Sequence, residues 1–278
     1  MSIKITADST CDLSPELLER YQITLQPLTV TMGGNAYQDG VSIRPDDIFS
    51  HVANGGELPA TSAVNIADYQ EFFAPLSARY DAVIHINIGR EFSSCYQNAC
   101  VAAEEFGNVY PVDSANLTTG QGMLAIEAAI AAQRGDDAQS ILDMLRELAG
   151  RVDTTFVVDK LDYLAKGGRC SSAAALGANL LKLKPCIVLS DGRMAVGKKY
   201  RGAWEKVLPG YVEDRLSGRD ICKDRVFITH TACDPAVVEA IRAQLEPMGF
   251  GEILETTAGC TVSCHCGPNT LGVLFIRK

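Results

Sequence analysis

The sequence predicts two α/β domains: residues 1–150, built on a parallel sheet, and residues 151–278, built on a mixed sheet. Apolar strand-like runs alternate with helix-length segments through the first half, which is typical of βαβ units. In the second half, Asp191-Gly192 separates two β-rich arms and suits the tight turn of a hairpin. A further strand–helix–strand run follows this hairpin. Because a hairpin pairs antiparallel and a βαβ unit pairs parallel, the second sheet should be mixed.

The N-terminal domain should contain strands and helices in alternation. Ser14 and Pro15 are a typical N-cap and first residue of a helix. Strands are expected at 3–8, 81–88 and 109–114, with a β-rich stretch at 23–32. Helices are expected at 13–22, 43–56, 65–80, 93–106, 120–135 and 136–150. The last of these is amphipathic, with one apolar face formed by Ile141, Leu142, Leu145 and Leu148.

The C-terminal domain should begin with a strand at 154–159 and a short helix at 161–169 that two glycines end. The hairpin occupies 186–200. The remaining elements are a strand at 225–231, a helix at 235–249 and strands at 252–257 and 271–278.

Composition narrows the class of protein. The chain has 278 residues, 47% of them hydrophobic and 21% charged, as expected of a soluble globular protein. Its net charge is −9, so non-specific binding to nucleic acid, which depends on neutralising phosphates, is not expected. No apolar run approaches the roughly 20 residues that cross a bilayer, and the first residues do not resemble a secretory signal. The ten cysteines show no paired spacing, so we expect reduced thiols and a cytoplasmic location.

Two motifs resemble cofactor or metal sites. GQGMLA, with Gly120, Gly122 and Ala125, fits a dinucleotide loop, but the preceding strand ends near Val112, too early to place these glycines at its end. The interpretation we favour is the entry of a packed helix. No GxxxxGK[ST] loop is present in the sequence, so we expect no ATP site on this chain.

The stretch CTVSCHC, residues 260–266, contains thiols and one imidazole but no second pair of ligands for zinc. In an extended stretch, Cys264 and Cys266 would share one face and His265 would point to the other. We interpret the cysteines as buried thiols, beside a histidine with another role.

Two hydroxyl pairs suggest a site for an anion. Ser93 and Ser94 follow the strand at 81–88, and Thr61 and Ser62 precede the helix at 65–80. A helix N-terminus offers unpaired N–H groups and a positive dipole end. The two pairs could therefore converge on one carboxylate at the carboxyl ends of the parallel strands. Two alternatives stay open: Ser93 as a simple N-cap, and Ser93 or Ser94 as an esterase nucleophile with His265.

The whole chain resembles the DegV family, the fatty acid-binding (FakB-type) component of bacterial fatty acid kinase. The matching stretches are ITADSTCDL, ATS at 60–62, SSCYQNA at 93–99, VDSANLTTGQG, FVVDKLDYLAKGGRCS, LKLKPCIVLSDGRM, KKYRGAWEKV and HCGPNTLGVLF. The resemblance implies a two-domain fold that buries a long-chain fatty acid between the domains. It also implies a role in phospholipid metabolism, without a cofactor on this chain, because ATP and Mg²⁺ belong to a partner kinase subunit.

The resemblance also assigns residues. Thr61 and Ser93, with Ser62 and Ser94 beside them, would bind the carboxylate, and His265 would lie close to it. Arg169 and Arg201 would serve acyl-phosphate chemistry or contact the kinase. The chain has TSAV, SSC and HCGPNT where the family pattern has TSQP, SGT and HxGPGA.

Apolar burial would supply the affinity. A sixteen-carbon chain gains roughly 11 kcal/mol before association losses, at about 0.8 kcal/mol per CH₂. The expectation is a binding protein and not an enzyme, with transient membrane contact compatible with that role. A lipid carrier without a kinase partner is the alternative.

Overall fold

A four-stranded parallel sheet organises the first half of the chain. The computed structural model describes residues 1–170, 172 and 183–278. The strand order is β2-β1-β6-β7. The strands are β1 (Ile3–Asp8), β2 (Thr24–Gln26), β6 (Ala82–Asn87) and β7 (Val109–Asp113), and all pair parallel.

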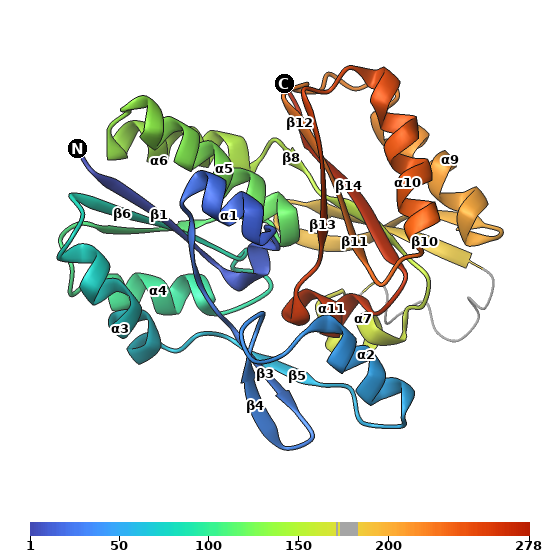
Figure 1. The fold of residues 1–278 in the computed structure, drawn as a ribbon, viewed down its shortest axis with the longest axis horizontal. Coiled ribbons are helices and arrows are strands. Elements are labelled where there is room, and N and C mark those ends of the chain that lie inside the picture. Colours follow the sequence, from blue (N-terminus) through green and yellow to red (C-terminus); the bar gives the residue numbers. More distant parts are fainter. Residues whose placement is uncertain (171, 173–182) are drawn as a thin grey trace.

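Helices cover both faces of this sheet (Figure 1). On one face lie α1 (Pro15–Tyr21), α5 (Thr118–Arg134) and α6 (Ala138–Ala149). On the other lie α3 (Ile66–Ser77) and α4 (Cys95–Ala103). In α6, Ile141, Leu142 and Leu145 are buried and Leu148 is partly buried, as its periodicity predicts.

A seven-stranded mixed sheet organises the second half, as predicted. Its order is β11-β10-β9-β14-β12-β13, and β8 also pairs with β14. The strands are β8 (Val152–Asp153), β9 (Thr155–Val158), β10 (Leu183–Ser190), β11 (Arg193–Arg201), β12 (Arg225–Thr231), β13 (Glu252–Thr257) and β14 (Thr270–Ile276). Of these, β12 and β13 pair parallel. Asp191 and Gly192 have φ values of 51° and 74°, the left-handed pair that a type I′ hairpin turn requires.

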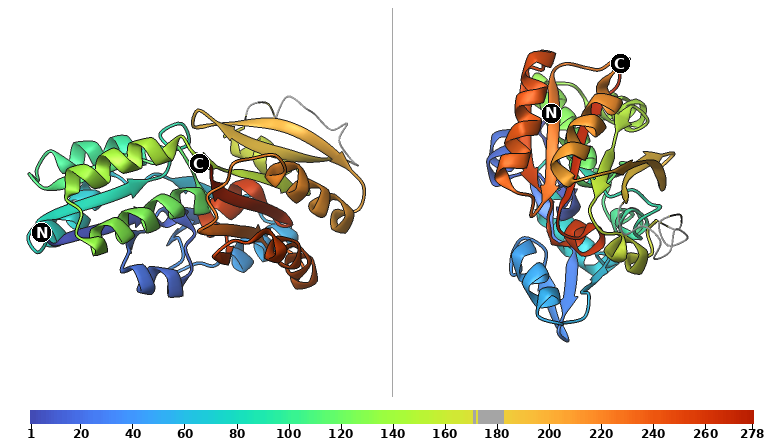
Figure 2. Two further views of the ribbon diagram at one scale, coloured as in Figure 1. Left: turned by 90° about the horizontal axis from the view of Figure 1, so that it is seen from above. Right: turned by 90° about the vertical axis from the view of Figure 1, so that its right-hand side faces the viewer.

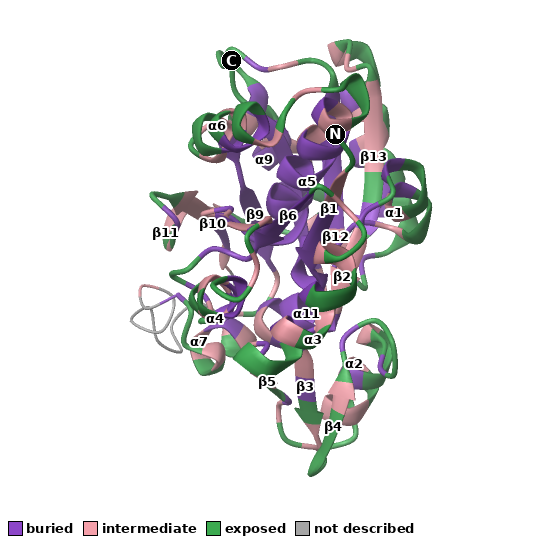
Figure 3. Ribbon diagram, turned by 90° about the vertical axis from the view of Figure 1, so that its left-hand side faces the viewer, coloured by how far each residue is buried: buried purple, intermediate pink, exposed green. Residues whose placement is uncertain are grey.

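The two sheets lie side by side along the molecule (Figure 2) and share part of one core. On the mixed sheet, α9 (Trp204–Leu216) and α10 (Pro235–Leu245) cover one face. Helix α5 packs against the opposite face, where Phe227 and Leu274 join the core of the parallel-sheet layer. Buried residues therefore run from β1 and β6 through α5 to β9 and β12 (Figure 3).

A third, antiparallel sheet was not predicted as a separate unit. It consists of β3 (Thr29–Met32), β4 (Asn35–Gln38) and β5 (Ala60–Ser62), with α2 (Pro45–Ala53) beside it. This unit packs against α11 (Cys260–Cys266), which in turn contacts α7 (Asp162–Gly167), as Figure 1 shows. Two short 3₁₀ helices, η1 (Ser9–Cys11) and η3 (Glu246–Met248), complete the described elements.

Two helices were not predicted from the sequence. CTVSCHC forms α11, so Cys264 and Cys266 do not share one face as they would in an extended stretch, and they pack into different clusters. Helix α9 was not predicted, since Pro209 and Gly210 interrupt its apolar pattern. The change from one sheet to the other falls between α6 and β8. The domain boundary at residue 150 remains a proposal, because α5 packs against both sheets.

Within the described residues, no helix is both long and apolar enough to span a membrane. Residues 171, 181 and 182, which belong to two of the stretches that resemble the family, lie outside the described part of the chain.

Candidate functional site

A cavity of about 50 Å³ lies where the parallel sheet, the small antiparallel sheet and the mixed sheet meet. Most of its wall is apolar, formed by Leu28, Ala63, Ile88, Phe92, Leu117, Met194, Val262 and Cys266. Its polar side chains are Thr61, Ser62, Ser93, Arg169, Thr261 and His265. Five of the seven residues that the sequence assigned to a carboxylate or phosphate site therefore line one cavity.

Thr61 and His265 form the central polar pair. The Thr61 Oγ1 lies 2.8 Å from Nε2 of His265. The Nδ1 atom of His265 is buried and has no hydrogen-bond partner among the described residues. An unpaired buried N–H costs more than an unpaired lone pair, so we assign the proton to Nε2. Nε2–H then donates to Thr61 Oγ1, which leaves the Thr61 O–H free to donate to a ligand.

The surroundings of His265 keep it neutral. Burial lowers its pKa to about 4, and the positive charge of Arg169 acts in the same direction. Gly167, at the end of α7, packs directly on the ring, since a β-carbon there would approach Nδ1 to 2.4 Å. The absence of a side chain at Gly167 is therefore a spatial requirement of the site.

Arg169 brings a positive charge to the mouth of the cavity. Its side chain is exposed, and its Nη1 donates to the Gly167 carbonyl at 2.8 Å. Its Nε donates to the Phe92 carbonyl at 3.4 Å, which joins the α7 segment to the loop after β6. Among the described residues no carboxylate pairs with Arg169, so the charge is available to an anionic ligand.

Ser93 reaches the cavity from the carboxyl end of β6, where the sequence places it. Its Oγ accepts a hydrogen bond from the Cys95 N–H at 3.3 Å, and its O–H donates to the Cys95 sulfur at 3.1 Å. Gly89 lets the loop before Ser93 approach the Ala115 backbone, because a β-carbon would lie 3.1 Å from the Ala115 carbonyl carbon. Ser94, by contrast, is exposed and does not line the cavity.

The expectation that both hydroxyl pairs lie at helix N-termini is wrong for Thr61 and Ser62. These residues belong to β5 of the antiparallel sheet, where Thr61 pairs with Val30. Helix α3 begins later and is capped by Asn65, whose side chain accepts from the Asp68 N–H at 2.9 Å. Thr61 therefore reaches the cavity as a side chain on a strand and not from a helix N-terminus.

Arg201 lies apart from the cavity. It is exposed at the end of β11, opposite Leu183. Met194, which lines the cavity, lies near the other end of the same strand. At about 3.3 Å per residue, seven residues separate the two by about 23 Å. Arg201 therefore lies at the surface, away from the cavity.

Two buried carboxyl groups hold the first turn of α11 in place. The Gly259 N–H donates to Asp12 Oδ1 at 2.9 Å, and the N–H groups of Cys260 and Thr261 donate to Asp39 at 2.8 and 3.1 Å. Burial raises the pKa of Asp12 to about 8, although the hydrogen bonds from Thr118 and Gly259 act in the opposite direction. These contacts occupy the helix N-terminus and orient the face that carries His265.

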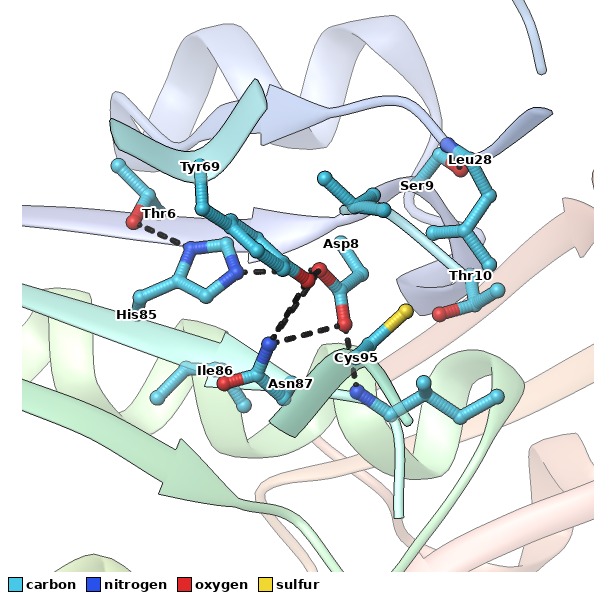
Figure 4. A network of polar contacts seen from close by, with 12 residues as sticks. Thr6, Asp8, Ser9, Thr10, Leu28, Tyr69, His85, Ile86, Asn87 and Cys95 are labelled. Atoms are coloured by element: carbon cyan, nitrogen blue, oxygen red, sulfur yellow. Dashed lines mark hydrogen bonds and ion pairs between the residues drawn. The ribbon is translucent and has the colours of Figure 1, made fainter. Parts of the chain in front are cut away.

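A buried polar network around Asp8 lies next to the cavity, which Ile88 lines (Figure 4). The sequence analysis did not predict this network. Asp8, at the end of β1, accepts hydrogen bonds from the Tyr69 hydroxyl at 2.6 Å, from His85 Nε2 at 3.0 Å and from the Ile88 N–H at 2.9 Å. Asn87 also donates to its carboxyl group at 3.2 Å. The signal was His85, a fully buried polar residue inside an apolar strand, which requires a partner.

Metal and nucleophile chemistry receive no support from the described residues. No group of His, Cys, Asp or Glu side chains within them has the arrangement of a metal site. On α11, Cys260 and Cys264 pack into the cluster with Ile43, whereas Cys266 packs into another cluster. In the described part of the chain, Ser93 makes no hydrogen bond to His265, and no carboxylate orients the His265 ring.

A second cavity of about 20 Å³ continues the first and shares Leu117, Val262 and Cys266 with it. It extends between α11 and the mixed sheet, toward Ala258 and Phe156. At roughly 10–15 Å³ for each water molecule, the two cavities hold only a few waters. A long apolar ligand would therefore have to push their walls apart.

Comparison with known proteins identifies the family that the sequence resembles, over almost the whole length of the chain. Residues 2–278 match the model of the DegV family of uncharacterised proteins. A DegV domain-containing protein of Deinococcus radiodurans is 34% identical, over 98% of each chain. A DegV family protein from Thermus thermophilus, described for its fatty acid binding, has a TM-score of 0.89 and 30% identity, over 100% of each chain. DegV of Bacillus subtilis, a fatty acid binding protein, has a TM-score of 0.86 and 27% identity, also over 100% of each chain.

Proposed function

The chain belongs to the DegV family, and from this membership we propose that it binds a long-chain fatty acid in the cavity described above. The main support is that the wall of this cavity has a polar part and a larger apolar part. Thr61 contacts His265, whose pKa is lowered by burial and by the charge of Arg169, and Arg169 bonds to the carbonyl of Phe92, next to Ser93. These polar groups therefore lie near one another, and apolar side chains form most of the wall. An amphipathic acid has the same division between head group and tail. The similar proteins from T. thermophilus and B. subtilis, described as binding fatty acids, support this assignment.

The carboxylate is bound mainly by neutral donors. The Thr61 O–H is free to donate once His265 Nε2–H donates to Thr61 Oγ1. Ser93 supplies a second hydroxyl by turning its O–H from the Cys95 sulfur to the ligand, and Arg169 supplies the positive charge at the exposed side. Hydrogen bonds to a charged group contribute about 1.5–3 kcal/mol each, so this end of the site sets orientation. Burial of the tail supplies most of the affinity.

Binding requires the apolar walls to move. The cavity volume of about 50 Å³ is far below that of a sixteen-carbon chain, so tail and protein must adjust together. Met194 on β11 and Leu117 before α5 come from different sheet layers. Separation of these layers would open a continuous path into the second cavity.

The direct test is lipid retention by purified protein. After delipidation, the wild type should take up one hexadecanoic or octadecenoic acid per chain, measured by native mass spectrometry. The double variant Thr61→Ala/Ser93→Ala should lose most of this retention. Ser50→Ala, an exposed serine of α2 outside the cavity, is the matched control. No uptake by the wild type, or unchanged retention by the double variant, would refute the proposal.

We further propose that the bound carboxylate is presented to a separate ATP-dependent kinase for acyl-phosphate formation. Arg169 is exposed and Ser93 is half-buried, so a carboxylate held between them would remain reachable from solvent while the tail points inward. In this reaction, a carboxylate oxygen attacks the γ-phosphorus of ATP, and ADP leaves. ATP and Mg²⁺ are bound by the partner.

The presentation step has its own test. Loaded, immobilised protein is incubated with an extract of the native cells, ATP and Mg²⁺, and acyl phosphate is trapped with hydroxylamine as a hydroxamate. Hydroxamate formation that falls with Arg169→Ala supports the proposal. Lipid exchange without any hydroxamate identifies a stand-alone carrier. Covalent labelling of wild-type Ser93 by a fluorophosphonate would instead favour the esterase alternative.

A further inference from the structure

We propose that Thr261 recognises a second polar group on the ligand, and that the preferred ligand class is the 3-hydroxy fatty acids. The inference rests on the proposed function, because it assumes a carboxylate at the Thr61–His265 pair. It adds a residue that sequence patterns did not indicate. It also adds a chemical feature of the ligand that an apolar cavity alone would not select.

The Thr261 side chain lines the cavity, and its hydroxyl bonds to none of the residues that the structure describes. Thr261 is 5% exposed, and its hydroxyl oxygen has no hydrogen-bond partner among the described residues. Buried hydroxyl groups are nearly always hydrogen-bonded, since a missing partner costs free energy. A partner inside the cavity would satisfy this group.

The backbone around Thr261 offers its hydroxyl no partner within the described part of α11 and the segment before it. A threonine inside a helix commonly donates to the carbonyl four residues earlier, but residue 257 belongs to β13. The Ala258 carbonyl, the next candidate, accepts from the Ser263 hydroxyl at 3.2 Å and makes no hydrogen bond with the Thr261 hydroxyl. The Thr261 N–H is bound to Asp39, which fixes the backbone and leaves the hydroxyl alone unpaired.

The spacing to His265 indicates which part of the ligand Thr261 would meet. The two residues are four positions apart on α11, so their side chains lie on one face, about 5–6 Å apart at the β-carbons. Both line the same cavity. With the carboxylate at His265 and Thr61, Thr261 lies beside the first few carbons of the chain. A hydroxyl on carbon 3 can both donate and accept there, as the threonine hydroxyl can.

The second cavity gives the acyl chain of the ligand a direction that passes Thr261. Val262 and Cys266 belong to both cavities, and Ala258, which precedes α11, lines the inner one. An acyl chain that runs from His265 toward Ala258 therefore follows α11 from its last turn to its N-terminus. Thr261 is the residue with an unpaired hydroxyl on this path.

The test compares matched acids on delipidated wild-type protein, Thr261→Val and Thr261→Ser by isothermal titration calorimetry. We expect the wild type to bind 3-hydroxyhexadecanoic acid about fivefold more tightly than hexadecanoic acid, the effect of one additional hydrogen bond. Thr261→Val should remove this preference and keep the affinity for hexadecanoic acid, and Thr261→Ser should retain the preference. A 12-hydroxy group on octadecanoic acid should bring no gain.

The outcomes separate this inference from the proposed function. Equal affinity of the wild type for hexadecanoic and 3-hydroxyhexadecanoic acid overturns the role of Thr261 and leaves fatty acid binding intact. Equal weakening of both acids by Thr261→Val also overturns it, since Thr261 would then bind the carboxylate. Failure of the wild type to bind either acid refutes the proposed function itself, and the inference with it.

Discussion

The hydroxyl oxygen of Thr61 lies 2.8 Å from Nε2 of His265, although 204 residues separate the two in sequence. Thr61 stands on β5 of the small antiparallel sheet, and His265 stands on the last turn of α11. The contact therefore joins the N-terminal part of the chain to the C-terminal part in the wall of the cavity. Its geometry leads to the first two predictions.

Replacing Thr61 by valine should weaken fatty acid binding by about tenfold or more. Valine keeps the shape of threonine but removes the O–H that donates to the carboxylate, a bond of about 1.5–3 kcal/mol. Thr61→Ser keeps the hydroxyl and should bind within about threefold of the wild type. Calorimetric titration with hexadecanoic acid measures both variants. Equal affinities of the valine and serine variants would show that the hydroxyl makes no contact with the ligand.

His265 should make the ligand-free protein less stable as the pH falls from 6.5 to 4. Burial lowers its folded-state pKa to about 4, whereas the unfolded value is 6.5, so the unfolded chain binds a proton first. The loss is about 3 kcal/mol at most, reduced by the partial exposure of the ring. His265→Asn should remove this part of the pH dependence, measured by urea unfolding at pH 7, 6 and 5. An unchanged profile in the variant would place the dependence elsewhere.

Replacing Gly167 by alanine should disturb the site through His265. The new β-carbon would approach Nδ1 to 2.4 Å, so the ring must move away from Thr61. Overpacking of this kind costs about 1–3 kcal/mol, and affinity for hexadecanoic acid should fall about tenfold. Gly210→Ala is the control, because a β-carbon in that part of α9 meets nothing within 4 Å. Its melting temperature should be equal or higher. Wild-type affinity in the Gly167 variant would contradict the packing argument.

Replacing Asp8 by asparagine should destabilise the fold by about 2–4 kcal/mol. The carboxyl group accepts from Tyr69, His85 and Ile88, and an amide nitrogen in its place leaves at least one buried donor unpaired (Figure 4). Asp143→Asn, on the exposed face of α6, should change stability by less than about 0.5 kcal/mol. Urea unfolding followed by circular dichroism compares the two. Similar midpoints would mean that the network contributes little.

Much of the architecture follows from local patterns in the sequence. The alternation of strands and helices predicts the parallel sheet, and the Asp191-Gly192 turn predicts the hairpin that makes the second sheet mixed. Helix α6 follows from its apolar face. These features can be predicted because hydrophobic periodicity and turn conformation depend on residues that are close together in the chain.

Other elements could not be predicted because their stabilising partners are distant in sequence. CTVSCHC forms α11, and the N–H groups at the start of this helix donate to Asp12 and Asp39. Because these two carboxyl groups are distant in sequence, no local pattern predicts that they cap the helix. The placement of Thr61 on a strand depends on β3, which precedes it by about 30 residues. The Asp8 network depends on pairing of β1 with β6.

The sequence by itself determined the fold class, the hydroxyl groups of Thr61 and Ser93, and the resemblance to the DegV family. Only the tertiary structure decided that Thr61 meets His265, that Gly167 makes room for the imidazole and that Arg201 lies apart. It also placed the unpaired hydroxyl of Thr261 beside this pair. The physical reason is that a binding site forms where separate segments meet in space. Residue type and spacing predict single elements, whereas the distances between them are set by the packing of the two larger sheets against α5 and of the small antiparallel sheet against α11.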